Sequence, residues 1–281
     1  MAWHEWPLIV FTVLAQTAVG AYLLVGSVIL RNTLTTEVSD RLHKAMFFIW
    51  VLMGLGFMAS TMHLGSPLRA FNALNQVGSS WLSNEIFTGS LFFALGGSYW
   101  LLALLKLGPV ALRNIILVVG MLVGISFIYS MIMVYLISTV PTWNTLYTPL
   151  AFVLTTLLSG LIFGHLLLTI AKHHNADMDN ALPLVGAIFA ALYIVVVVGQ
   201  IIDLHNTTSA LGSAMDVIPN LMQLQILRIG LLFAAIICWF IPRLIKARPT
   251  LFTMLLSLIF ILLAELTGRG IFYGLHMTVG L

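Results

Sequence analysis

Four polar side chains near the C-terminus interrupt a long apolar stretch at helical spacing. Glu265, Arg269, Tyr273 and His276 follow one another at i, i+4, i+8 and i+11. At about 100° per residue these positions fall within roughly 80° of one helix face. An ionisable group in the middle of a membrane costs about 2.5–3.5 kcal/mol on insertion scales, so this face is expected to point into the protein interior. It either lines a ligand site or holds a structural Glu265–Arg269 pair, with His276 in interfacial water.

A second group of candidate residues follows another apolar stretch, in the segment H-L-G-S-P-L-R-A-F-N of residues 63–72. His63 opens this segment and Arg69 follows six residues later. Glu85 comes next, in S-N-E, where Ser83 is expected to cap a helix whose dipole favours an acid in the first turn. Taken singly, His63 is explained as an exposed residue at a helix end and Glu85 as a first-turn acid. Together, at one membrane face, they indicate a site.

These residue types suit the oxidation of a lipid-soluble quinol, which releases two electrons and two protons. Histidine accepts a proton near neutral pH, and a carboxylate can carry it onward to water. His63 and Glu85 fit these two catalytic roles, and Arg69 can hold a ring oxygen or the carboxylate. The residues expected to bind the quinol are His63, Arg69, Glu85, Glu265, Arg269, Tyr273 and His276.

The electrons need an acceptor, and the sequence favours one outside this polypeptide. Haem b in a helix bundle needs pairs of histidines on facing helices, but among eight histidines only His165 lies well inside an apolar stretch. A surface pair such as His63 and His276 stays open. Cys238 is the single cysteine, whereas an iron–sulfur cluster takes four thiolates. We therefore expect no haem, cluster or metal site in this protein, and an acceptor on a partner subunit docked at the same face.

The composition places these residues in a helical membrane protein. Only 7% of the 281 residues are charged, against about 25% in soluble domains, and 60% are hydrophobic. These values exclude a soluble globule and a disordered polypeptide, and the continuous apolar stretches argue against a β-barrel. The sequence predicts an all-α integral membrane protein with eight transmembrane helices of about 20 residues each. The predicted spans are residues 7–30, 45–62, 86–105, 112–137, 148–171, 181–202, 226–242 and 250–271.

The basic residues predict how these spans are oriented. Nine of the 12 Lys and Arg residues lie in alternate connections, which the positive-inside rule places in the cytoplasm, so both termini are expected in the periplasm. The net charge of +3 is therefore a topology signal and gives no indication of nucleic-acid binding. The two longest connections, near 63–85 and 203–225, lie on the opposite face. His63 and His205 end two spans 142 residues apart, which would suit two four-helix units related by an axis along the membrane normal.

Five segments carry a family resemblance: W-H-E-W-P-L (3–8), W-V-L-M-G-L-G-F-M-A-S-T-M-H-L-G-S-P-L-R-A-F-N-A-L-N (50–75), L-S-N-E-I (82–86), T-V-P-T-W (139–143) and G-R-G-I-F-Y-G-L-H-M-T-V-G (268–280). In these segments the protein resembles the membrane anchor subunit of bacterial dimethyl sulfoxide reductase. The resemblance covers all residues, 1–281, as a single transmembrane anchor domain with eight spans.

The resemblance implies a multi-pass protein of the bacterial inner membrane that works in anaerobic respiration. Such an anchor takes electrons from menaquinol, carries no haem, and binds an iron–sulfur subunit that in turn binds a molybdopterin catalytic subunit, both facing the periplasm. In the family the histidine of H-L-G-S-P and the glutamate of S-N-E are associated with the quinol site. They map onto His63 and Glu85, and the arginine of the same motif maps onto Arg69. Related anchors serve reductases with other substrates, so the terminal acceptor stays open.

Three other functions are compatible with the sequence. A haem-b quinol cytochrome subunit of another respiratory oxidoreductase would need a histidine pair. A secondary transporter would use the possible repeat and the buried Glu265, but its polar groups would gather near the midplane instead of near one face. A purely structural anchor would leave the polarity at that face unexplained.

Overall fold

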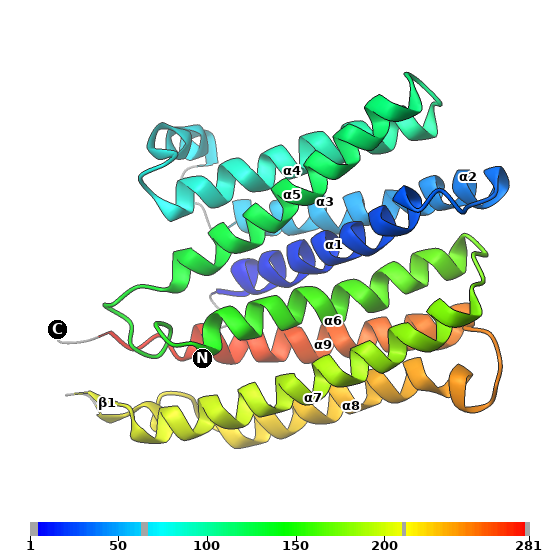
Figure 1. Ribbon diagram of the computed structural model, residues 1–281. Coiled ribbons are helices and arrows are strands. Elements are labelled where there is room, and N and C mark those ends of the chain that lie inside the picture. Colours follow the sequence, from blue (N-terminus) through cyan, green and yellow to red (C-terminus); the bar gives the residue numbers. More distant parts are fainter. Residues whose placement is uncertain (1–4, 63–66, 210–211, 279–281) are drawn as a thin grey trace.

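The computed structural model describes residues 5–62, 67–209 and 212–278, and this part of the protein is almost entirely helical (Figure 1). Eight helical stretches are long and apolar enough to cross a membrane, which confirms the predicted number of spans. The long helices are α1 (Trp6–Leu30), α2 (Thr36–Ala45), α3 (Phe47–Thr61), α4 (Trp81–Leu104), α5 (Val110–Tyr135), α6 (Tyr147–Ile170), α7 (Ala176–Asn206), α8 (Leu221–Leu244) and α9 (Leu251–Gly274). The short elements are the 3-10 helices η2 (Pro67–Gln76) and η3 (Ala214–Asp216) and the antiparallel strands β1 (Thr208–Ser209) and β2 (Gly212–Ser213).

Several helices extend beyond the apolar stretches from which they were predicted. The second span was expected from residue 45, but helix α2 already begins at Thr36. Its sequence is polar, so hydropathy does not reveal it, yet its ends carry helix signals. The Thr35 side chain caps the Val38 amide, Glu37 lies in the first turn and Lys44 in the last, where the helix dipole favours these charges.

The two ends of the bundle differ in their connections. The start of α1 and the end of α9 lie at the same end as η2 and β1, on the left in Figure 1. The short connections after α1, α4, α6 and α8 lie at the other end, and the basic residues that predicted a cytoplasmic face lie in these connections or in the helix turns beside them. The two faces are thus separated as the charge pattern required, while their assignment to periplasm and cytoplasm stays a prediction.

The two halves of the protein share their helix spacing. Corresponding helical stretches begin 140 or 141 residues apart, at Trp6 and Tyr147, Thr36 and Ala176, Trp81 and Leu221, and Val110 and Leu251. The first and third helical stretches of each half are followed by a residue with a left-handed backbone conformation. These residues lie 140 positions apart in the two halves: Asn32 and Lys172 follow the first stretches, and Lys106 and Lys246 follow the third. These correspondences support the two four-helix units expected from the sequence, whose origin by duplication stays a prediction.

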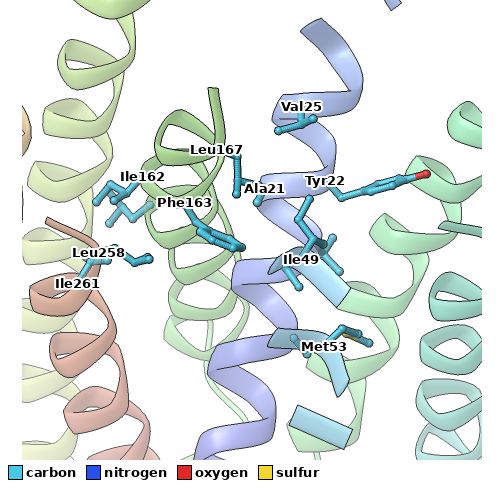
Figure 2. Packing of buried hydrophobic residues seen from close by; sticks show 14 of the residues in the cluster. Ala21, Tyr22, Val25, Ile49, Met53, Ile162, Phe163, Leu167, Leu258 and Ile261 are labelled. Atoms are coloured by element: carbon cyan, nitrogen blue, oxygen red, sulfur yellow. The ribbon is translucent and has the colours of Figure 1, made fainter. Parts of the chain in front are cut away.

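Helices α1 and α6, the first of each half, form the centre of the bundle. Figure 2 shows Ala21 and Val25 of α1 facing Phe163 and Leu167 of α6 within the buried core. The backbones approach so closely at Gly20 and Gly160 that a Cβ on either would clash with the other helix. Thr17 Oγ1 donates a 2.8 Å hydrogen bond to Ser159 Oγ beside this crossing. Small residues and interhelical hydrogen bonds are the means by which helices associate in membranes, where lipid is as apolar as the side chains.

Candidate functional site

The first predicted cluster lies partly outside the described residues. His63 falls in the segment 63–66, which is not described. The backbone of Arg69 lies in η2, but its side chain is also outside the described part. The expected meeting of these two side chains with Glu85 therefore stays a prediction.

Glu85 does not lie in the first turn of a helix, where the sequence had placed it. Helix α4 begins at Trp81 with Ser80 at its N-cap, so Ser83 is not the cap and is instead buried inside the helix. Glu85 is the fifth helical residue and is only 4% exposed. Its Oε1 has no hydrogen-bond partner among the described residues. A buried carboxylate oxygen without a partner is costly, which weakens the interpretation of Glu85 as a surface acid that only complements the helix dipole.

Two tyrosines interact electrostatically with Glu85: Tyr135, the last residue of α5, and Tyr273 near the end of α9. The two phenol oxygens are 2.5 Å apart and share a hydrogen bond. Both rings are buried. Glu85 therefore interacts electrostatically with a pair of hydroxyl groups that can donate and accept protons.

The predicted polar face of α9 points into the bundle, with one exception. Glu265, Arg269 and Tyr273 are each at most 4% exposed. His276 is exposed and lies after α9 ends at Gly274, so it does not continue the helix face. Its ring lies 4.8 Å from that of Trp143, which in turn donates a 2.7 Å hydrogen bond to the backbone of Phe272.

Glu265 is held by side chains from two other helices. Its Oε2 accepts 2.7 Å hydrogen bonds from Thr155 of α6 and from Tyr193 of α7. Arg228 of α8 donates to the same Tyr193 hydroxyl. The direct Glu265–Arg269 pair expected as the structural alternative is not among the ion pairs of the described residues, because Arg269 is engaged elsewhere.

Arg269 turns towards α1 and α6. It donates a 2.9 Å hydrogen bond to Gln16 Oε1, and its guanidinium carbon lies 3.6 Å from the ring centre of Phe152. A cation over an aromatic face is stabilised more strongly when it is desolvated. A second contact, 3.5 Å to Thr155 Oγ1, joins Arg269 to the partners of Glu265.

These residues form one buried polar network across the bundle. It comprises Gln16, Glu85, Tyr135, Thr155, Tyr193, Arg228, Glu265, Arg269 and Tyr273. The sequence pattern did not single out Gln16, Thr155, Tyr135 or Tyr193 as site residues. In the sequence each of them is simply a polar residue within an apolar stretch. Many residues with a purely structural role have the same pattern, so it does not identify a site. The network carries two carboxylates and two guanidiniums, all of them buried.

His165 was the single histidine expected well inside a span. Its Nδ1 accepts a 2.8 Å hydrogen bond from Trp239, and its Nε2 lies 3.2 Å from Asp179. Both ring nitrogens are thus engaged by protein groups, which disfavours His165 as a haem ligand. Within residues 5–62, 67–209 and 212–278, no group of three or more His, Cys, Asp or Glu side chains could hold a metal ion.

The fold and the buried network define an all-helical, multi-pass membrane subunit with a polar interior near one face. The model of the DMSO reductase anchor subunit (DmsC) family matches residues 1–275, and this protein belongs to that family. It is 44% identical over 280 residues to the C subunit of anaerobic dimethyl sulfoxide reductase of Escherichia coli, and 44% identical over 281 residues to the YnfH subunit of an anaerobic dimethyl sulfoxide reductase of the same organism. It is also 44% identical over 278 residues to the C subunit of the Haemophilus influenzae enzyme. Each match covers 99% of this protein and 97% of the relative. The protein is therefore an inner-membrane anchor subunit of an oxidoreductase complex with catalytic and iron–sulfur partner subunits.

Proposed function

We propose that this anchor oxidises menaquinol near the periplasmic face and passes the electrons to its iron–sulfur partner. The partner would feed a molybdopterin subunit that reduces dimethyl sulfoxide. The observation that carries the proposal is the buried carboxylate oxygen of Glu85, which has no described partner, while Glu85 interacts electrostatically with Tyr135 and Tyr273. An unpartnered acceptor at this depth suits the hydroxyl group of a quinol ring.

The chemistry assigned to this site is a two-electron oxidation. Breaking the two O–H bonds of the quinol yields the quinone, two electrons and two protons. Glu85 accepts one proton at Oε1, and His63 accepts the other, with Arg69 holding a ring oxygen. Glu85 is four residues into α4, about 6 Å along the helix axis, so the proton has a short path to the outer water. The electrons leave to the partner subunit.

The α9 residues take supporting roles in this proposal. Tyr273 supplies a hydroxyl group that interacts electrostatically with Glu85, and Arg269 supplies a positive charge that interacts with Tyr273. Glu265 offsets the charge of the two buried guanidiniums through its contacts with Thr155 and Tyr193. His276, exposed beside Trp143, is suited to release protons to water.

The test is the Glu85→Gln variant of the assembled complex, which keeps the side chain's size and removes the proton acceptor. General acid–base catalysis contributes about 10²–10⁴-fold, so quinol-driven reduction should fall by about 100-fold or more. Reduction driven by an artificial dye that delivers electrons directly to the partner subunits should keep its rate.

The matched control is Glu37→Gln, which removes an exposed carboxylate at the opposite end of the bundle. It should leave both rates unchanged. Full quinol-driven turnover in Glu85→Gln would refute the assignment and favour a purely structural anchor.

A further inference from the structure

The second half of the molecule leaves a positively charged cavity at the end of the bundle that carries the short connections. The cavity has a volume of about 380 Å³ and is partly open. It lies between the start of α7, the end of α8 and the connection to α9. Three cationic side chains line it, those of Arg243, Lys246 and Arg248.

The corresponding place in the first half is closed by an ion pair. Lys106 follows α4 as Lys246 follows α8, with φ of 56° and 52°, and both begin a K-x-x-P segment. Lys106 Nζ lies 2.7 Å from a carboxylate oxygen of Asp40. The residue 140 positions after Asp40 is Asn180, which carries no charge. The second half therefore lacks the carboxylate that pairs with this lysine in the first half.

The second half also carries more positively charged residues than the first half at the corresponding positions. Arg243 and Arg248 stand where the first half has Ala103 and Gly108. Arg243 donates a 2.5 Å hydrogen bond to the backbone oxygen of Asn180.

Only part of this charge is neutralised within the cavity. In the described residues neither Lys246 nor Arg248 has an ion-pair partner. Asp179 is the one carboxylate among the described lining residues, and His165 contacts it at 3.2 Å. Among its Asp, Glu, Lys and Arg residues, the lining carries three positive charges against one negative charge.

We propose that this cavity binds the phosphate headgroup of an anionic phospholipid. A cluster of cations at the end of membrane-spanning helices attracts such headgroups, and a basic pocket between helices holds them in place. The neighbouring surface suits the acyl chains, because Leu184 and Ile188 of α7 and Leu244 of α8 are exposed and apolar. In the first half the corresponding lysine, Lys106, is instead paired with Asp40.

The test is a lipid titration of the delipidated, assembled complex, followed by native mass spectrometry. The probes are phosphatidylglycerol, phosphatidylcholine and inorganic phosphate. One phosphatidylglycerol should bind at least tenfold more tightly than phosphatidylcholine. Each cation near a membrane surface contributes about fivefold, so Lys246→Gln combined with Arg248→Gln should weaken binding about thirtyfold.

The control combines Arg31→Gln with Lys44→Gln, two exposed cations at the same end of the bundle. It should change phosphatidylglycerol affinity less than twofold. Equal binding of the two lipids, or an equal loss in the control, would overturn the proposal. Displacement of the lipid by millimolar inorganic phosphate would assign the site to free phosphate instead. If the double variant fails to assemble, Arg248→Gln alone should still weaken binding about fivefold, and an unchanged affinity would refute the site.

Discussion

Glu265 provides a sharp test of the buried polar network, because it is a buried carboxylate close to two buried guanidiniums. Replacing it with Leu removes the acceptor of two hydrogen bonds, from Thr155 and Tyr193, and removes the carboxylate that interacts with Arg228 and Arg269. Replacing it with Gln keeps an acceptor oxygen and removes only the charge. The pair of variants therefore separates the hydrogen bonds from the charge.

The expected cost follows from the contacts. Removing one partner from a buried ion pair costs about 3–5 kcal/mol of stability. Each hydrogen bond to a charged group contributes about 1.5–3 kcal/mol to stability. Glu265→Leu should therefore lower the free energy of unfolding by about 4 kcal/mol, and Glu265→Gln by about half as much. At about 2–4 °C for each kcal/mol in a protein of this size, the Leu variant should melt about 10 °C below the unmodified protein.

The assay is thermal unfolding of the purified complex in detergent, followed by tryptophan fluorescence. Glu37→Gln serves as the control, because that carboxylate is exposed and pairs with Arg41 on the surface. A Leu variant as stable as the unmodified protein would refute the reasoning, since it would mean that Arg228 and Arg269 do not depend on Glu265.

Two further outcomes test the fold and the site. Gly160→Ala, whose Cβ would meet the backbone at Gly20, should destabilise the protein by about 1–3 kcal/mol in the same melting assay, whereas Gly97→Ala, which has open space, should be neutral or stabilising. Equal melting temperatures for the two variants would contradict the close α1–α6 contact. Tyr273→Phe, which breaks the hydrogen bond to Tyr135, should lower quinol-driven turnover about five- to tenfold with the dye-driven rate intact. An unchanged quinol-driven rate would remove Tyr273 from the site.

Much of the fold was predictable because membrane spans are a local property of the sequence. Eight apolar stretches of sufficient length predicted eight helices, and the structure has them. The polar α2 was missed, because its helix is fixed by the Thr35 cap and its charges and not by hydropathy. The early start of α4 was missed for a similar reason, since Ser80 and not Ser83 precedes the helix.

The candidate site was predictable only on one helix. Spacing by four residues placed Glu265, Arg269 and Tyr273 on one inward face, and all three are buried. Their partners could not be read in this way, because Thr155 lies 110 residues from Glu265 in the sequence and Gln16 lies 253 residues from Arg269. Such contacts depend on how α1, α6, α7 and α9 pack, and packing in lipid is decided by small residues and hydrogen bonds that leave little periodic signal.

The central claim is that the Glu85 carboxylate binds the quinol ring, and equilibrium binding of a quinol analogue to the assembled complex tests it most directly. A lost hydrogen bond to a charged group corresponds to a tenfold or larger change in affinity. The unmodified complex should bind one analogue, Glu85→Gln should bind it at least tenfold more weakly, and Glu37→Gln should bind it unchanged. Equal affinity of the unmodified complex and Glu85→Gln would contradict the proposed site.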